Sequence, residues 1–406
     1  MPNMLAKNHA ADTSGVLLAW IVILVTSIAS ARAEAPSGAA RSIAPLNPSI
    51  LLFHKPHHNN GVEQVRRAAQ LGCRTVNVVV TLWCDIDEQR QVLSLGRLHK
   101  GKYRPLDDQL LAEFSEQLRL VFAAAVEHDL DLSILGHLNS GGKVEDWRNF
   151  FLFDPLVEYA GYSYQQAMIE PIVEALVATV GPQTRVEFSL TGEMGRSAFV
   201  YPESYVQLID SLHQEPRLPD LELGLSFNFN RADGEHESTP EQLAGLNRLL
   251  QRCDFIGMSH YRWFELPIDR DDFVQAVDLF WKQFDLPGVE ADRGKPMHFS
   301  EVGLGGGRDN GVPAETAQQA AKTPYRGCTD PATNPWRDPQ LRQLRLDFHR
   351  ALLEYLANQP PGTNLTEAFL WSEGSWDPMD IVDVGFADQE IIDLIRQHND
   401  SAAVRK

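Results

Sequence analysis

The sequence predicts an α/β protein built as a single-domain (β/α)8 TIM barrel. The chain has 406 residues, of which 43% are hydrophobic and 22% charged, a balance typical of a globular domain large enough for this fold. Short apolar runs alternate with amphipathic stretches, which indicates βαβ units and a parallel sheet. The first apolar run is not followed by the glycine-rich phosphate loop that the competing doubly wound open sheet would favour.

Eight apolar runs are predicted to be the barrel strands. Near-continuous β-branched runs such as TVNVVVTL at 75–82 are typical of strands that are buried on both faces. The predicted strands, in chain order, are 49–53, 75–82, 130–135, 185–190, 221–227, 255–259, 296–299 and 367–371.

Eight segments with apolar residues at helical spacing lie between and after these runs. The segment 106–127 shows the pattern most fully, because its leucine, phenylalanine and valine residues recur every three or four positions. The predicted helices are 62–71, 106–127, 164–180, 202–212, 240–252, 271–284, 339–356 and 388–397.

The first 33 residues are predicted to be a signal peptide and not part of the fold. A short polar region precedes the apolar run 15–28, and Ala31-Arg32-Ala33 forms an A-x-A cleavage signal. The run is shorter than the roughly 18 to 20 residues that a membrane span needs, although an uncleaved signal anchor is the alternative. We therefore expect a secreted or periplasmic protein with a short linker at 34–48 and the catalytic barrel at 49–406.

The formal net charge of −19 narrows the classes of partner. An acidic surface argues against nucleic acid and against an anionic membrane, so neither is expected once the signal is cleaved. A strongly anionic polymer is also disfavoured as substrate, unless a local basic cleft overrides the net charge. Nothing in the sequence indicates oligomerisation, and we expect a monomer.

Four cysteines follow the signal peptide, in a compartment that permits disulfides. Cys73 and Cys84 flank one extended run and would be too far apart to bond. A Cys84–Cys328 disulfide is the first pairing to expect, since both residues are predicted in loops after strands. Free buried thiols are the alternative.

Aromatic and polar residues follow the predicted strands, at the end of the barrel where active sites are built. Aromatic faces stack on the C–H faces of sugars, while amides and imidazoles hydrogen-bond hydroxyl groups. The residues expected to contact substrate are His54, Trp83, His137, Asn228, His260, Tyr261, Trp263 and Trp371.

Glu193 and Glu301 follow the fourth and seventh predicted strands. Cleavage of a glycosidic bond needs two carboxyl groups, one to protonate the leaving oxygen and one to attack carbon or to activate water. The carboxyl ends of the strands meet at one mouth, so we expect the two glutamates to lie close together. Glu187, inside the fourth strand, is the rival of Glu193, and Glu373 and Asp377 are further acidic candidates near the mouth.

The segment PMHFSEVG at 296–303 resembles the strand-seven signature of clan A glycoside hydrolases, in which the glutamate is the nucleophile. The segment CDFIGMSHY at 253–261 is similar to the clan's strand-six pattern, where a Tyr or His beside the nucleophile orients it. Trp371 matches the strand-eight tryptophan that floors the −1 sugar subsite. His137 and Trp147 resemble the strand-three segment, so the similarity extends over most of the mature chain.

The resemblance implies a retaining hydrolase with Glu193 as acid/base and Glu301 as nucleophile. Tyr261 would hold Glu301, while Trp371 and Trp263 would form sugar platforms. The implied substrate is a polysaccharide or oligosaccharide with β-glycosidic bonds, cleaved internally, and neither a cofactor nor a metal is expected.

Two positions depart from the clan's pattern and keep two other functions open. Gly192 stands where clan members carry an asparagine before the acid/base, and the run 75–83 lacks the arginine that strand two commonly carries. A catalytically impaired barrel that binds glycans is therefore one alternative. The other is a metal-assisted hydrolase or lyase that uses His54, His57 and His58, although their spacing gives no helical i, i+4 pair.

Overall fold

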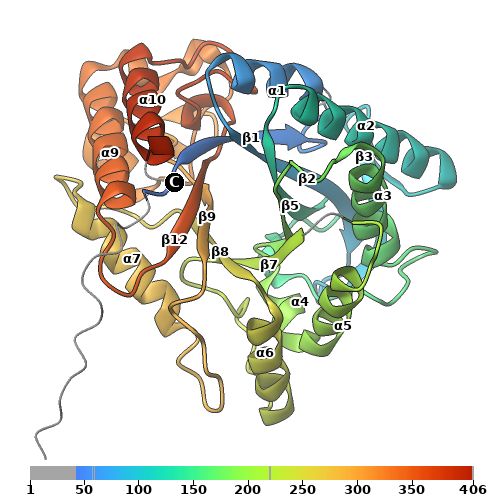
Figure 1. Ribbon diagram of the computed structural model, residues 1–406. Helices are drawn as coiled ribbons and strands as arrows, with labels where there is room; N and C mark the ends of the chain where they lie inside the picture. The colour runs from blue at the N-terminus through green and yellow to red at the C-terminus, as the bar shows by residue number, and fades with distance from the viewer. Residues whose placement is uncertain (1–42, 57, 59, 219–220, 405–406) are drawn as a thin grey trace, which may run out of the picture. The chain divides into compact units, whose positions relative to one another are not determined.

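The computed structural model describes residues 43–56, 58, 60–218 and 221–404, which form a closed eight-stranded parallel barrel with helices outside it (Figure 1). Each strand pairs with the next in chain order, and the ring closes because the first strand pairs with both the second and the last. The predicted (β/α)8 barrel is confirmed. Its strands are β1 (Leu46–Leu52), β2 (Thr75–Ile86), β5 (Asp131–Ser140), β6 (Val186–Gly192), β7 (Leu221–Asn228), β8 (Phe255–His260), β9 (Met297–Val302) and β12 (Leu365–Leu370).

The helices cover the outer face of the barrel. Several begin at a side chain that caps the first turn: Thr239 and Asp269 each form a reciprocal capping box with the third helical residue. The eight predicted helices correspond to α1 (Gly61–Gln70), α2 (Asp108–Glu127), α3 (Glu170–Thr179), α5 (Pro202–His213), α6 (Pro240–Arg252), α7 (Arg270–Lys282), α9 (Pro339–Ala357) and α10 (Gln389–Val404). None of the helices formed by the described residues combines the length and the apolar character needed to cross a bilayer.

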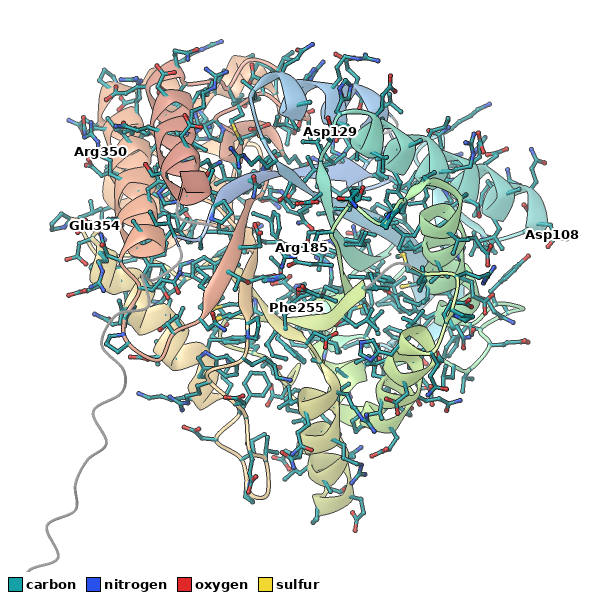
Figure 2. The ribbon with its side chains drawn as sticks, in the orientation of Figure 1. Asp108, Asp129, Arg185, Phe255, Arg350 and Glu354 are labelled. Atoms are coloured by element: carbon teal, nitrogen blue, oxygen red, sulfur yellow. The ribbon has the colours of Figure 1, made fainter. Side chains whose placement is uncertain are left out.

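One end of the barrel interior is filled by an ion-pair network around Arg185, which Figure 2 places near Phe255 within the ring. The guanidinium lies 3.1 Å from a carboxylate oxygen of Glu222 and 3.1 Å from one of Glu367, and it also contacts Glu187. All of these residues stand at or next to the amino-terminal ends of their strands. Glu187, the alternative to Glu193 as acid/base, therefore pairs with Arg185 at this end of the barrel. The mouth that carries the candidate active site lies at the other end.

The first strand begins earlier than predicted. β1 starts at Leu46, inside the segment 34–48 that was expected to be a linker, and the buried Leu46 N–H donates to Asn399 Oδ1 at 2.9 Å. The bond ties this strand to α10, so the linker prediction fails for residues 46–48. The predicted signal peptide at 1–33 lies outside the described residues.

The predicted Cys84–Cys328 disulfide is wrong, because all four cysteines are free thiols. Cys84 is not in a loop: β2 continues to Ile86 and buries Cys84 within the sheet. Burial raises the pKa of the Cys84 thiol well above its usual value, which keeps it protonated and unreactive.

Two hairpins extend the carboxyl-terminal mouth. β3 (Val92–His99) pairs antiparallel with the end of β2 and then with β4 (Lys102–Pro105), which adds a two-stranded arm beside the mouth. β10 (Gly307–Asp309) and β11 (Val312–Pro313) form a small second hairpin after β9. The sequence predicted neither hairpin.

Candidate active site

Glu193 lies directly after β6 and is held by three side chains. Asn228 Nδ2 donates to Oε1 at 2.7 Å, and Trp147 Nε1 donates to Oε2 at 3.0 Å. A guanidinium nitrogen of Arg148 lies 3.6 Å from Oε2. The glutamate has a φ of 56°, a left-handed conformation that is uncommon outside glycine. Backbone strain of this kind is characteristic of functional sites, and here it follows a register shift between β6 and β7.

Glu301 lies near the end of β9 and has a close neighbour at each carboxylate oxygen, of which Oε2 accepts a hydrogen bond. The Tyr261 hydroxyl donates to Oε2 at 3.1 Å, and His137 Nε2 lies 2.8 Å from Oε1. The pairing of β9 with β8 and with β12 shifts register just before or at Glu301. A bulge inserts one extra residue, so it re-aims the following side chain, and this explains how both Ser300 and Glu301 can face inward.

The two carboxyl groups influence each other's ionisation. Burial raises the pKa of Glu193, and the negative charge of Glu301 raises it further. Burial also raises the pKa of Glu301, to about 7, against the opposing effects of Arg148 and of the Tyr261 hydrogen bond. Once Glu301 is ionised, Glu193 is therefore favoured in its protonated form, as a general acid requires.

His137 occupies the space that a side chain at position 192 would fill. A Cβ built on Gly192 would lie 2.4 Å from His137 Cδ2 and 2.5 Å from Nε2, far inside contact distance. Burial holds the pKa of His137 well below its usual value, so the ring is neutral. Gly192, which stands where clan members carry an asparagine, therefore leaves room for the His137 imidazole beside Glu301.

The close packing of Gly192 against His137 predicts the effect of placing an asparagine at position 192. Gly192→Asn should displace the imidazole from Glu301 and lower kcat/KM by about 10²-fold, the cost of a misplacement of about 1 Å at a reacting group. The double variant Gly192→Asn with His137→Ala should recover part of that loss, because the clash is gone. Steady-state kinetics of the wild type, Gly192→Asn, His137→Ala and the double variant test this. A double variant less active than both single variants would contradict the close packing of position 192 against His137.

Trp371 forms one wall beside the two glutamates. It follows β12, is 6% exposed, and its ring lies 6.0 Å from that of His137 at an interplanar angle of 21°. The ring of His54 meets it edge-on at 5.2 Å. These positions are compatible with the sugar-contact roles expected for the three residues.

Glu373 lies next to Trp371 and is surrounded by charged and polar side chains. Its Oε2 accepts a 3.4 Å hydrogen bond from the Trp371 indole, and its Oε1 contacts the Lys55 ammonium. Burial would raise the pKa of Glu373, but His54 and Lys55 lower it more, and the carboxylate is ionised.

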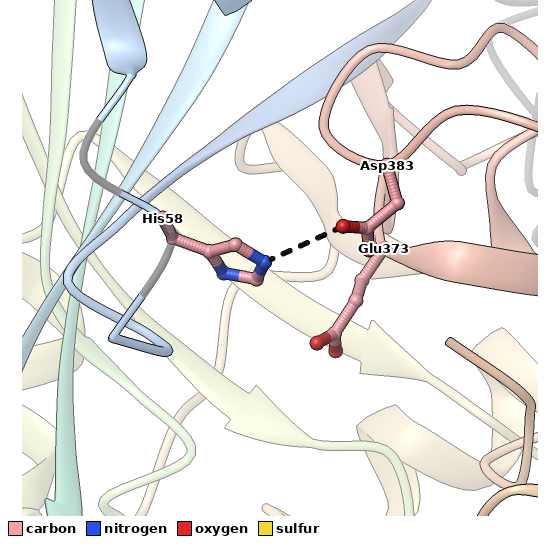
Figure 3. Close-up of side chains that lie close together, drawn as sticks. All are labelled: His58, Glu373 and Asp383. Carbon is pink, nitrogen blue, oxygen red and sulfur yellow. Dashed lines mark ion pairs between the residues drawn. The ribbon is translucent and has the colours of Figure 1, made fainter. Parts of the chain in front are cut away.

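Figure 3 shows Glu373 together with His58 and Asp383. His58 Nε2 lies 3.9 Å from Asp383 Oδ1, and the three potential ligand atoms lie within 4.8 Å of one another. One imidazole and two carboxylates are suitable zinc ligands. The Lys55 ammonium contacts Glu373 and so supplies a positive charge to this group without a metal. His57, the remaining histidine after the first strand, lies outside the described residues.

Three residues that were expected to contact substrate have other neighbours in the structure. His260 is fully buried among Phe264, Phe273 and other aromatic rings between β8 and α7, so the structure does not support a contact with substrate. Trp263 is 46% exposed at the rim, where the Lys322 ammonium lies 3.9 Å from its ring centre. Trp83 is half-buried and donates its indole N–H to the Phe53 carbonyl at 2.9 Å.

The sequence did not predict that Arg148 and Lys55 lie at the site. Arg148 is carried by a loop that Asn149 anchors: the Asn149 amide donates to the Arg231 carbonyl at 2.6 Å and accepts from the Gly195 N–H at 2.9 Å. The clan resemblance pointed to the neighbouring Trp147, but it gave no role to Arg148. Arg148 brings a positive charge to a site whose second strand lacks the arginine expected there.

The fold is similar to that of solved glycoside hydrolases. The structure of the GH113 β-mannanase AaManA from Alicyclobacillus acidocaldarius in complex with ManMIm has a TM-score of 0.50 at 13% identity and covers 89% of this chain and 98% of that chain. A complex of GH113 β-1,4-mannanase (TM-score 0.48, 13% identity) covers 89% and 99%. The endo-1,4-β-mannanase from Rhizomucor miehei (TM-score 0.40, 13% identity) covers 88% and 94%.

At 13% identity, the likeness to AaManA shows the barrel fold alone. A scan against models of protein families and a search of curated proteins find no match.

Proposed function

We propose that this protein is a secreted, retaining glycoside hydrolase of clan A that cleaves β-glycosidic bonds within a polysaccharide. One observation carries the proposal: two buried carboxyl groups at the barrel mouth have different partners, and the charge of one raises the pKa of the other. A double displacement needs two such carboxyl groups, one as acid/base and one as nucleophile, and we assign these roles to Glu193 and Glu301. The clan resemblance at residues 253–261 and 296–303 supports the same assignment.

In the first step, an ionised Glu301 oxygen attacks the anomeric carbon, and the bond from that carbon to the leaving oxygen breaks. The proton of Glu193 goes to the leaving oxygen, and a glycosyl-enzyme ester forms. In the second step, Glu193 removes a proton from water, which attacks the anomeric carbon and releases Glu301. Tyr261 fixes one oxygen of the nucleophile, while Asn228 and Trp147 fix the acid.

The proposed mechanism predicts how activity depends on pH. Glu301 must be ionised to attack, so kcat/KM should fall as the pH drops through the raised pKa of Glu301, about 7. Tyr261→Phe removes a hydrogen bond that lowers this pKa, so the acidic limb should move to higher pH. A pH profile of kcat/KM for both proteins measures this, and an acidic limb near 4.5 in the wild type would contradict it.

Release of reducing ends from β-mannan, β-glucan, galactan and xylan tests the function itself. We expect one polymer to be shortened to oligosaccharides of mixed length, because the proposed cleavage is internal. The assay should be run with and without EDTA, since among the described residues the group His58, Glu373 and Asp383 favours metal assistance. Activity that EDTA removes and zinc restores would replace the two-glutamate proposal with the metal-assisted one.

A further inference from the structure

The arm formed by β3 and β4 is basic in an otherwise acidic protein. The segment 89–106 contains five lysines and arginines and neither aspartate nor glutamate, whereas the whole chain has 36 basic and 55 acidic residues. Lys100, Lys102 and Arg104 are exposed near the turn of the hairpin. The positive charge is therefore concentrated on one structural element.

This arm lies at the same end of the barrel as the two catalytic carboxyl groups. β3 pairs with the carboxyl-terminal extension of β2, where Trp83 lies opposite Gly96. Trp83 in turn donates to the carbonyl of Phe53, in the loop after β1. The basic arm and the loop after β1 are thus joined at the mouth.

A cavity of about 310 Å³ lies between the arm and the loop after β1. Its lining contains several basic side chains and a single carboxylate; the residues are Phe53, Lys55, Pro56, Arg97, Leu98, His99, Lys100 and Glu113. A neighbouring cavity of about 610 Å³ shares Phe53, Arg97 and Glu113 and extends along α2, where Glu116 adds a second carboxylate to its lining. Together they provide room for more than one sugar unit.

Arg97 is held in a fixed orientation in this lining. Its guanidinium carbon lies 4.1 Å from the centre of the Phe53 ring, and one of its nitrogens donates to the Leu110 carbonyl at 3.4 Å. The Nε of Arg97 is buried, so the guanidinium can offer a carboxylate only N–H groups of its two terminal nitrogens, in the plane that the ring stacking fixes.

Lys55 connects the cavity to the site of cleavage. Its ammonium contacts Glu373, and Glu373 accepts from the Trp371 indole beside the catalytic carboxyl groups. Glu373 balances the charge of Lys55, and Glu113 acts on Arg97, whose pKa it raises against the effect of burial. Among the described residues that line the cavity, Lys100 is a lysine that forms no ion pair.

We propose that the cavity is a subsite for a carboxylate-bearing sugar of the glycan. The carboxylate pairs with the terminal N–H groups of Arg97, and Lys100 adds a second positive charge. A neutral glycan would not require these cations, and the acidic surface elsewhere would repel an anionic one except at this arm. This substrate class rests on the proposed hydrolytic function.

Two matched pairs of hexasaccharides test the proposal: β-1,4-linked mannose against mannuronic acid, and β-1,4-linked glucose against glucuronic acid. Titration into the Glu301→Gln variant measures binding without turnover. In at least one pair, we expect the acidic oligosaccharide to bind at least about tenfold more tightly at low salt. Most of this advantage should vanish at about 1 M salt, where screening acts over about 3 Å.

Adding Lys100→Gln to the same background should remove most of the preference for the acidic sugar. The matched control is Lys282→Gln, an exposed lysine on α7, which should preserve the preference. Neutral and acidic sugars that bind equally, no binding in either pair, or a preference that survives Lys100→Gln would overturn the proposal.

The same experiment separates this inference from the proposed function. Tight, salt-dependent binding of the acidic sugar with no hydrolysis by the wild type would support the subsite and contradict the enzyme. Hydrolysis of a neutral polymer without any charge preference would support the enzyme and overturn the subsite.

Discussion

Glu301→Gln is expected to lower the hydrolysis of the preferred polysaccharide by at least about 10⁴-fold, because the amide cannot form the glycosyl-enzyme. The amide has nearly the same size and still accepts the Tyr261 hydrogen bond through its oxygen. Folding should therefore be preserved, and release of reducing ends by wild type and variant measures the loss.

An exposed glutamate provides the control. Glu290→Gln changes the same chemical group at the surface and should keep wild-type activity. Circular dichroism and the melting temperature of both variants should match those of the wild type. Normal turnover in Glu301→Gln would show that this carboxylate is not the nucleophile.

Glu193→Ala should lower polysaccharide hydrolysis by about 10² to 10⁴-fold, the usual contribution of a general acid/base. The first step should be spared for aryl glycosides whose leaving group needs no protonation. The second step should then be slow, and the glycosyl-enzyme should accumulate.

Azide distinguishes loss of the acid/base from general damage. Azide needs no deprotonation, and the space left by the Glu193 side chain admits it, so it should accelerate turnover of an aryl glycoside and yield a β-glycosyl azide. Asn228→Ala is the comparison, because it loosens the acid without removing it and should give no azide product. An α-glycosyl azide, or no rescue in Glu193→Ala, would count against the assignment.

The barrel could be predicted from the sequence because its strands are continuous apolar runs buried on both faces. All seven residues of β1 and of β6 are buried, for example. The β3–β4 hairpin escaped prediction because it is short, basic and largely exposed beyond Gly96. Such a segment carries little apolar alternation, so its sequence is typical of a loop.

The site was predictable where a side chain stands at the end of a strand and faces inward. His260 stands at the end of a strand but faces outward. Side chains alternate between the two faces of a strand, and Gly257 faces the inward side chains Ser226 and Ser300. Met258 and His260 therefore point outward to the helices. Register shifts reverse this alternation at Glu301, and only the structure reveals them. Arg148 depends on long-range anchoring of its loop, which no local pattern encodes.

The configuration of the first product tests the central claim most directly. Proton NMR during the first minutes of hydrolysis, on a glycan that the reducing-end assay or the hexasaccharide pairs identify as substrate, distinguishes the two anomers before they equilibrate. Two glutamates acting as nucleophile and acid/base predict the β-anomer first, because two inversions restore the configuration. An α-anomer formed first would mean direct attack by water, and it would contradict a glycosyl-enzyme on Glu301.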